Sequence, residues 1–341
     1  MRYLVTVCVF LLTVVADGST ARPAPARFEF SQAHMGTRFK IILYARNKEL
    51  AVRAANAAFE RVAELDGIMS DYRETSELMR LCHRAGGGPV SVSADLFRVL
   101  ERAQAVARQS GGAFDVTAGP LVRLWRRARR TGEMPDPQRL AQARALTGYA
   151  KLTLDPKTRS VSLERPGMLL DLGGIAKGYA ADAALLVLKR FGIRRALVAA
   201  GGDIVAGDPP PGARGWAIGI QPLEPAESSS APRLVLVNAA VSTSGDAEQF
   251  VEINGVRYSH ILDPRTGLGV TGHSSVTVVA PDGTTSDAMA TAASVLGPKD
   301  GLAFINAAEN VAALFLQSDH GQVRAFYSKH WRDVPQSGPE R

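Results

Sequence analysis

Apolar residues recur every three or four positions in a long stretch near the start of the chain, which is typical of an amphipathic helix. This stretch, residues 48–69, predicts a helix whose apolar positions are Ala51, Ala55, Phe59, Val62 and Leu65. A second helix is predicted at 95–109, with Ser93 as N-cap and Gly111-Gly112 as its stop. Further helices are predicted at 137–146, 176–191 and 287–296.

Short runs of branched and aromatic residues predict strands among these helices. They lie at 39–44, 151–154, 160–163, 169–172, 196–200, 216–221, 234–238, 249–253, 256–261, 276–280, 311–316 and 323–327. Asn254-Gly255 is a type I′ hairpin signal between two of them. Hairpins mixed with helices favour an α+β fold over regular βαβ winding. The Pro- and Ser-rich stretch 222–232 is expected to be a surface loop.

The N-terminus has the pattern of a secretory signal. Arg2 precedes an unbroken apolar run, residues 3–16, and small residues suit cleavage after Ala16. The run is shorter than the roughly 20 apolar residues of a membrane-spanning helix; an uncleaved anchor or a buried segment is the alternative. We expect an exported, periplasmic protein with a signal peptide (1–16), a Pro/Ala-rich linker (17–27), one domain (28–334) and a polar tail (335–341).

Composition excludes several classes of protein. The 341 residues are 46% hydrophobic and 21% charged, which argues against collagen-like, coiled-coil and wholly disordered chains. Two cysteines over this length exclude a disulfide-rich scaffold. The net charge of +7 and the pI of 9.6 raise the question of nucleic-acid binding. We expect no nucleic-acid partner, because no groove-reading motif and no aromatic platform with interleaved Lys or Arg appears.

Glycine-rich turns are the densest chemical signals. Asp171-Leu-Gly-Gly-Ile-Ala-Lys-Gly178 joins an apolar strand to a helix and places Lys177 in the first helical turn. Such a turn suits either a phosphate site or a structural turn with an exposed lysine; the residue order excludes a Walker loop. Gly201-Gly202-Asp203 alone fits a tight turn. Ser110-Gly-Gly-Ala-Phe-Asp115 fits a helix C-cap, or a site where Phe114 and Asp115 meet an aromatic ring that carries an amine.

Two polar segments hold candidate acid–base and metal-binding groups. His260 suits acid–base catalysis and Arg265 suits phosphate binding, unless Asp263 and Arg265 only pair to stabilise a turn. Asp287 and Thr291 are four apart on a predicted helix, so their oxygens share one face and suit a hard cation such as Mg²⁺. The alternative is Asp287 as the helix N-cap. The sequence has neither a zinc spacing nor a hydrolase elbow.

Taken in order, these motifs resemble the FAD:protein FMN transferases of the ApbE type. The match covers about residues 33–325. It runs through His34-Met-Gly-Thr37, Met69-Ser-Asp-Tyr-Arg-Glu-Thr-Ser-Glu-Leu78, Gly112-Ala-Phe-Asp-Val-Thr-Ala-Gly-Pro-Leu121 with Trp125, 171–182, Gly201-Gly-Asp203, Thr243-Ser-Gly245, 259–267 and 287–291. Each motif alone is weak, whereas the ordered set is specific. The resemblance implies an α+β fold of two lobes with FAD between them.

The resemblance also implies a reaction and its site. The family transfers the FMN half of FAD, with Mg²⁺, to a Ser or Thr of an acceptor protein and releases AMP. FAD would be lined by Met35, Tyr72, Ala113, Phe114, Asp115, Asp171, Lys177 and Ile261, with Tyr72 stacked on the flavin. Backbone oxygens of Gly174 and Ala290 and side-chain oxygens of Asp287 and Thr291 would bind Mg²⁺. His260 would be the catalytic acid–base residue, and Lys177 and Arg265 would help to neutralise the pyrophosphate.

Two alternative functions also fit these residues: an FAD pyrophosphatase and a periplasmic flavin-binding carrier. Relatives that hydrolyse FAD tend to lack an aromatic residue at the Tyr72 position, so Tyr72 favours the transferase. The family's acceptors imply membrane redox subunits as partners. The densest basic cluster, Arg123 to Arg130, is expected on a solvated helix. The excess positive charge of the whole chain would orient the protein toward the anionic inner-membrane surface and attract anionic FAD.

Overall fold

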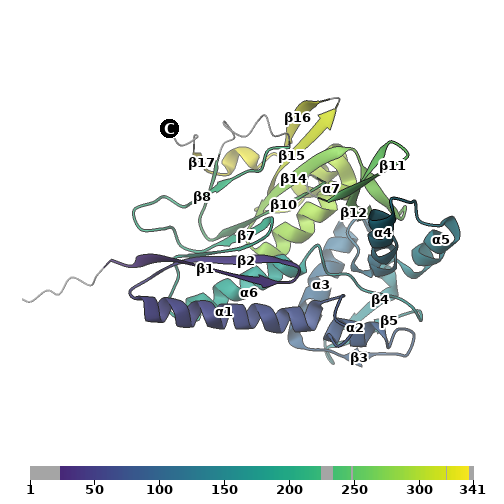
Figure 1. Cartoon of the computed structure of the whole chain (residues 1–341), viewed down its shortest axis with the longest axis horizontal. Helices are drawn as coiled ribbons and strands as arrows, with labels where there is room; N and C mark the ends of the chain where they lie inside the picture. The colour runs from purple at the N-terminus through teal and green to yellow at the C-terminus, as the bar shows by residue number, and fades with distance from the viewer. Residues whose placement is uncertain (1–23, 224–232, 247–248, 320, 338–341) are drawn as a thin grey trace, which may run out of the picture.

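An eight-stranded antiparallel sheet forms the centre of the fold (Figure 1). The computed structural model describes residues 24–223, 233–246, 249–319 and 321–337. The strands stand in the order β1 (Ala26–His34), β2 (Thr37–Ala45), β6 (Ala196–Ala200), β7 (Asp203–Ala206), β10 (Ala239–Gly245), β14 (His273–Ala280), β15 (Ala312–Asp319) and β16 (Gln322–Tyr327). Every pairing between neighbours in this sheet is antiparallel.

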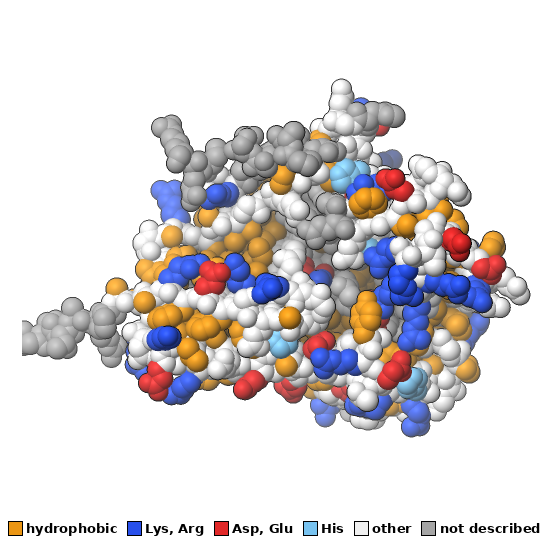
Figure 2. Space-filling view, viewed as in Figure 1, with side chains coloured by type: hydrophobic (Ala, Val, Ile, Leu, Met, Phe, Trp, Pro, Cys, Tyr) orange, Lys and Arg blue, Asp and Glu red, His pale blue; other side chains and the backbone are white. Residues whose placement is uncertain are grey.

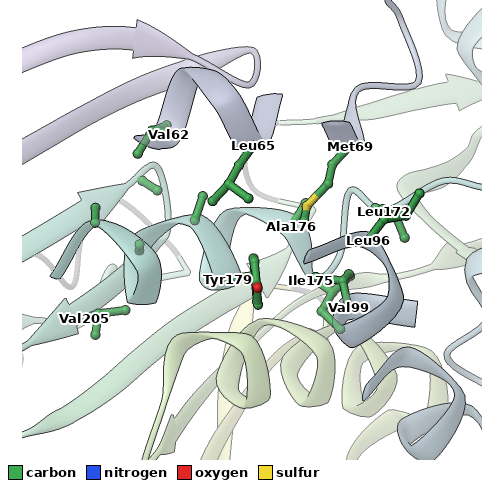
Figure 3. Packing of buried hydrophobic residues seen from close by; sticks show 14 of the residues in the cluster. Val62, Leu65, Met69, Leu96, Val99, Leu172, Ile175, Ala176, Tyr179 and Val205 are labelled. Atoms are coloured by element: carbon green, nitrogen blue, oxygen red, sulfur yellow. The ribbon is translucent and has the colours of Figure 1, made fainter. Parts of the chain in front are cut away.

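Helices cover one face of this sheet. They are α1 (Lys48–Met69), α6 (Ala176–Arg190) and α7 (Gly283–Asn306), which lie against the strands, and α3 (Ala94–Gln109), which packs on α1 and α7. Figure 3 shows their shared core, in which Met69 of α1 reaches Ala176 at the start of α6 and Ile175 lies beside Val99 of α3. Tyr179 of α6 and Val99 of α3 belong to the same buried cluster. This packing fixes the starts of α6 and α7, where the site residues lie.

A small sheet covers the opposite face. It has the order β17 (Gln336–Ser337), β9 (Arg233–Leu236) and β8 (Trp216–Gly219). Trp216 and Leu234 of this sheet and Trp331 form a second buried cluster with Leu197 of the central sheet. The middle strands of the central sheet are therefore buried on both faces, whereas the edge strands β1 and β16 are largely exposed.

The second lobe holds the remaining elements. These are α2 (Glu77–Cys82), α4 (Gly119–Thr131), α5 (Pro137–Leu146) and two further sheets, β3 (Val90–Ser91) with β5 (Ser160–Leu163) and β4 (Leu152–Asp155), and β11 (Phe250–Ile253) with β12 (Val256–Asp263) and β13 (Leu268–Thr271). Short 3₁₀ turns occur at Val116–Ala118, Tyr149–Lys151 and Trp331–Asp333. Trp125 of α4 is buried, and its Nε1 donates a hydrogen bond to the Gly267 carbonyl at 2.8 Å. This contact holds α4 against the β11–β13 sheet.

Most of the predicted elements are present. The helices at 48–69 and 137–146 have the predicted bounds, and Gly111 and Gly112 both have positive φ at the end of α3. Asn254 and Gly255 have positive φ in the β11–β12 turn, as a type I′ turn requires. The α+β expectation is confirmed.

Two predicted elements differ from the structure. Residues 169–172 form no strand; the segment is irregular, and the Asp171 amide donates to the Val116 carbonyl at 2.8 Å. The last predicted helix begins earlier, at Gly283, and is capped by Asp282, so the alternative of Asp287 as N-cap is wrong. It also continues to Asn306, past a break at Gly297 and Pro298.

Some predictions fall on residues that are not described. The predicted signal 1–16, residues 17–23 and most of the predicted loop 222–232 lie outside the described residues. In the part of the chain that is described, no helix has both the length and the apolar character that a membrane crossing requires. Cys82 is the only cysteine of that part; it is buried, and burial raises the pKa of its thiol to about 11.

Candidate active site

A cavity of about 580 Å³ lies where the two lobes meet. The central sheet contributes the β6–β7 turn and the end of β10, and the helices contribute the starts of α6 and α7 (Figure 1). The other lobe contributes residues 113–118, α4 and β12. The glycine-rich turns singled out in the sequence therefore face one common space.

Most of the predicted site residues line this cavity. They are Tyr72, Ala113, Phe114, Asp115, Asp171, Gly174, Lys177, His260, Ile261, Asp287 and Thr291. Two predicted residues are not among its lining residues. Met35 lies at the turn between β1 and β2 with φ of 50°, and Ala290 is fully buried within α7, between Asp287 and Thr291.

Lys177 joins two carboxylates at the base of the cavity. Its Nζ lies 2.8 Å from Oδ2 of Asp203 and 3.4 Å from Oδ2 of Asp287. The Gly178 amide also donates to Oδ2 of Asp287, at 3.1 Å. Lys177 is thus a bound ammonium group, in contrast to the exposed lysine of a purely structural turn.

A close crossing of α6 and α7 brings these groups together. A Cβ on Gly178 would lie 2.0 Å from the Gly283 carbonyl oxygen and 3.0 Å from Cβ of Asp287. Only glycine allows the two helices to approach this closely. The Gly-Ile-Ala-Lys-Gly sequence therefore places Lys177 and the Gly178 amide directly against α7.

Burial controls the charges of this cluster. Removal from water raises the pKa of Asp287 to about 7, and the Asp203 carboxylate adds to the rise. Burial alone would lower the pKa of Lys177, but Asp203 and Asp287 outweigh it and raise that pKa above its ordinary value. With both carboxylates ionised, one unit of negative charge is in excess at a nearly buried position.

The residues at this position fit Mg²⁺. Asp287 and Thr291 stand one helical turn apart, and a Cβ on Gly174 would lie 2.8 Å from Oγ1 of Thr291, so Gly174 and Thr291 are in contact. These are oxygen donors, which Mg²⁺ prefers, and a divalent cation would offset the excess negative charge. Among the described residues, no three or more His, Cys, Asp or Glu side chains gather as a metal-binding group.

A second charge network lies on the α4 side. Arg126 forms ion pairs with Asp71 and, at 2.9 Å, with Oδ2 of Asp171. Its guanidinium carbon stands 4.2 Å from the ring centroid of Tyr72, whose side chain is 74% exposed. Burial and the neighbouring Asp71 raise the pKa of Asp171, which Arg126 opposes. The expectation of a solvated helix at 123–130 is met on the outer side of α4, but Arg126 and Arg129 are half-buried and line the cavity.

Asp115 and Phe114 have structural partners within the cavity wall. Oδ1 of Asp115 accepts hydrogen bonds from the amide and the hydroxyl of Thr117, at 2.8 and 2.7 Å, and caps a 3₁₀ turn. Burial raises the pKa of this carboxyl. Phe114 is buried, and its amide donates to Oγ of Ser110 at 3.1 Å. The glycine turn therefore serves both as a helix stop and as part of the cavity wall.

His260 is fixed through one ring nitrogen. Its Nδ1 lies 3.1 Å from the Gln249 carbonyl oxygen. Because a carbonyl only accepts, Nδ1 carries the proton and Nε2 keeps a free lone pair. Partial removal from water lowers the pKa of His260, and the Arg129 and Lys177 cations act in the same direction. Neutral His260 can therefore accept a proton through Nε2.

Arg265 takes no part in the cavity. It pairs with Asp263 through two hydrogen bonds of 2.9 and 3.0 Å, and neither residue is among the lining residues. The structure therefore has the alternative arrangement, in which Asp263 and Arg265 pair with each other and stabilise their turn. The pyrophosphate-binding role expected for Arg265 is therefore wrong for this structure.

Comparisons with known proteins identify the family of this chain. The sequence profile of the ApbE family matches residues 35–315. The chain belongs to the ApbE family. The FAD:protein FMN transferase of Treponema pallidum (strain Nichols) is 36% identical over 94% of this chain and 92% of that protein. The FAD:protein FMN transferase of Klebsiella pneumoniae (strain 342) is 32% identical over 92% of this chain and 93% of that protein.

Solved ApbE structures share the fold. The structure titled flavin transferase ApbE from Vibrio cholerae superimposes with a TM-score of 0.83 at 29% identity, over 91% of this chain and 100% of that one. The Thermotoga maritima ApbE protein gives a TM-score of 0.80 at 30% identity, over 91% of this chain and 99% of that one. The resemblance and the fold class expected from the sequence are confirmed.

Within this ApbE fold, three charged residues of the cavity have no role predicted from the sequence. The sequence alone predicts a tight turn at Asp203 and a solvated helix at Arg126 and Arg129. The signal for Asp203 was its place directly after two glycines and a buried strand. The arginines gave no such signal, because their partners Asp71, Asp171 and Gln249 are remote in sequence.

Proposed function

We propose that this chain is a Mg²⁺-dependent FAD:protein FMN transferase. It moves the FMN half of FAD to a Ser or Thr hydroxyl of an acceptor protein and releases AMP. The names of its curated relatives support flavin transfer. The proposal of Mg²⁺-dependent transfer to a hydroxyl group rests on one main observation. The Lys177–Asp203–Asp287 cluster lines the same cavity as neutral His260.

The reaction exchanges the phosphoanhydride bond of FAD for a phosphoester bond to the acceptor. The acceptor oxygen bonds to the FMN phosphorus, the bond from that phosphorus to the oxygen bridging the two phosphates breaks, and AMP leaves with the bridging oxygen. The hydroxyl proton goes to Nε2 of His260, while Nδ1 keeps its own proton and donates it in the hydrogen bond to the Gln249 carbonyl. Lys177 supplies a fixed positive charge beside the pyrophosphate.

Mg²⁺ would be held by side-chain oxygens of Asp287 and Thr291 and by backbone oxygens of Gly174 and Ala290. When bound, it would neutralise charge on the pyrophosphate and on the departing AMP. Asp203 and Asp287 together hold Lys177 in place, so the ammonium group stays oriented whether or not substrate is present.

The remaining cavity residues would position the flavin nucleotide. Tyr72 is exposed at the cavity, and its ring is held by Arg126, which in turn is held by Asp71 and Asp171. An aromatic ring fixed in this way suits stacking on an isoalloxazine. Phe114 and Asp115 offer an apolar face and a carboxyl group on another wall.

We further propose that the protein acts after export, in the periplasm. Its acceptors would be membrane redox subunits that carry the flavinylated Ser or Thr, so the enzyme would work at the inner-membrane surface. This rests on the signal-like N-terminus and on the family resemblance.

The test is incubation of the purified protein with FAD and Mg²⁺, with and without an acceptor redox subunit. Covalent FMN is read by fluorescence of the denatured acceptor in a gel, and AMP by chromatography. We expect AMP and covalent FMN in equal amounts, both dependent on acceptor. Free FMN in both tubes with none bound would establish a pyrophosphatase instead. FAD that stays intact for hours in both tubes would point to a carrier.

A further inference from the structure

Helix α4 carries a dense arginine face beside the cavity. In its 13 residues, Gly119–Thr131, it has five arginines and no acidic residue. The opposite side of the helix, with Leu121, Trp125 and Ala128, is buried against the β11–β13 sheet. Figure 2 shows Lys and Arg side chains gathered where Figure 1 draws α4. The α4 arginine face consists of Arg123, Arg126, Arg127, Arg129 and Arg130.

Most of this charge is not neutralised inside the protein. Within the described part of the chain, Arg126 is the one arginine of this face that forms ion pairs, with Asp71 and Asp171. Arg129 donates to the neutral side chain of Gln249 at 3.1 Å. Arg127 and Arg130 are exposed and form no ion pair with any residue that the structure describes. A helix surface held rigidly with this much uncompensated charge favours a negatively charged partner.

The face runs from the cavity to the outside. Arg126 and Arg129 line the cavity, and Arg129 shares Gln249 with His260: the side chain of Gln249 accepts from Arg129 and its carbonyl holds His260. Arg127 and Arg130 are not among the lining residues. FAD in the cavity would contact Arg126 and Arg129. Arg127 and Arg130 would instead contact a partner bound outside the cavity, next to its rim.

We propose that the α4 arginine face docks an acidic segment of the acceptor protein and so guides its hydroxyl toward His260. The inference rests on the proposed function, in which a chain segment must cross the rim to reach the FMN phosphorus. A flexible acidic segment can follow the arginines from the outer side of α4 to the cavity wall. A flat anionic bilayer would contact only the outer ones, so the continuity of the face into the cavity favours a peptide.

Binding of defined peptides tests this docking. Fluorescein-labelled peptides with one threonine among Asp and Glu, among Asn and Gln, or among Lys residues would be titrated with the full chain, and anisotropy recorded. The variant Arg127→Glu with Arg130→Glu changes the outer face only. The matched control, Arg46→Glu with Arg53→Glu, makes the same change of charge at exposed positions around the start of α1, at the other end of the molecule (Figure 1).

We expect the acidic peptide to bind most tightly. At about 0.05 M salt, the affinity for the acidic peptide should be about tenfold lower in the α4 double variant than in the wild type. At about 0.5 M salt the difference should be less than about twofold, because salt screens exposed charges. The control variant should bind as the wild type does. Circular dichroism checks folding, and Arg127→Gln with Arg130→Gln is the milder substitute should the charge reversal unfold the protein.

Other outcomes overturn the proposal. Equal weakening by both double variants would mean a general effect of net charge, and equal affinity for all three peptides would mean no docking of acidic segments. Loss of binding to phosphatidylglycerol vesicles in the α4 variant, with peptide binding unchanged, would assign the face to lipid. Formation of AMP from FAD is measured on the same samples. A chain that binds the acidic peptide through α4 yet cleaves no FAD would refute the proposed function alone.

Discussion

His260 is the side chain whose protonation state the structure defines most fully. The Gln249 carbonyl fixes the proton on Nδ1, so a second proton on Nε2 converts the proposed base into an inactive cation. The pKa of His260 lies below its ordinary value of 6.5, because it is partly withdrawn from water and faces Arg129 and Lys177. The neutral, active form therefore persists down to pH values below 6.5.

From this we predict a pH profile. The transfer rate at saturating FAD and Mg²⁺ should be level around neutral pH and fall as the pH drops through the lowered pKa. His260→Gln should slow transfer by roughly 10²-fold or more and remove this acidic limb, since glutamine cannot accept the proton. The measurement is kcat against pH for both proteins. A variant that keeps the limb, or a near-normal rate, would show that another group is the base.

Asp287 combines an unfavourable environment with a necessary charge. Its pKa of about 7 shows that burial disfavours the ionised form in the protein without metal. Removing the carboxylate therefore takes away a costly buried charge and leaves Lys177 paired with Asp203. The fold should survive this change, but the excess negative charge that suits Mg²⁺ is lost.

We predict that Asp287→Ala abolishes Mg²⁺-dependent turnover and keeps the circular dichroism of the wild type. Mg²⁺ should raise the melting temperature of the wild type, because a ligand that binds the folded state stabilises it, and should leave that of the variant unchanged. Asp300→Ala, at an exposed position on the same helix, is the control and should behave as the wild type. Equal Mg²⁺ stabilisation in both variants would place the metal elsewhere.

At the scale of elements, the crossing of α6 and α7 determines the site. The two helices approach so closely at Gly178 and Gly283 that any side chain at Gly178 would overlap the backbone. Asp182 of α6 strengthens the same crossing, because its carboxylate accepts from the Gly283 and Thr284 amides at 2.8 and 2.9 Å. These contacts satisfy backbone donors at the start of α7.

Gly178→Ala should therefore destabilise the protein by about 1–3 kcal/mol, the usual cost of forcing an extra carbon into a packed contact. Gly67→Ala is a matched control, because Gly67 is also helical and a Cβ there meets nothing within 4 Å. That control should be neutral or stabilising by up to about 1 kcal/mol, since alanine favours helix more than glycine does. Chemical denaturation measures the free energy of unfolding of both variants. Equal values for the two would contradict the close contact of Gly178 with Gly283.

The elements also show how far the sequence alone predicts the fold. Helix 137–146 has local boundary signals, a capping Asp136 and a following proline, and its bounds are as predicted. The sequence does not predict the start of α7, because Gly283-Thr-Thr-Ser resembles a turn; in the structure Asp282 caps it and Asp182 of α6 binds its first amides. Residues 169–172 resemble a buried strand, but they pair with none of the strands in the described ranges.

The site residues, too, are predictable from the sequence where the signal is local and not where it depends on contacts made in the fold. Lys177 and Asp287 were found because each stands in a short motif with a recognisable spacing. Arg126 and Arg129 were misjudged, since nothing near them in sequence indicates the carboxylates of Asp71 and Asp171 or the amide of Gln249. Arg265 was misjudged for the opposite reason: its partner Asp263 is adjacent, and the pair is satisfied within its own turn.

At the scale of the whole molecule, FAD and Mg²⁺ should bind cooperatively. Both lobes line one cavity, and the negative excess at Asp203 and Asp287 repels a pyrophosphate until a cation is present. Coupling of this kind is reciprocal, so each ligand raises the affinity for the other by the same factor.

We predict that Mg²⁺ lowers the Kd for FAD by about tenfold or more, a coupling within the usual range. The measurement is quenching of flavin fluorescence in His260→Gln, which should bind FAD without consuming it, with Mg²⁺ or with EDTA. Adding Asp287→Ala should remove the difference between the two conditions. An FAD affinity that EDTA leaves unchanged would contradict the coupling.

The burial of Cys82 also gives the molecule a practical property. Because the reactive form of a thiol is its thiolate, a pKa of about 11 leaves only about one molecule in ten thousand reactive at neutral pH, behind packed side chains. A cysteine introduced at the exposed outer side of α4, in place of Arg130, would therefore react with a maleimide dye far ahead of Cys82. Such a dye would stand beside the cavity rim, where its emission can report the arrival and departure of a partner in real time.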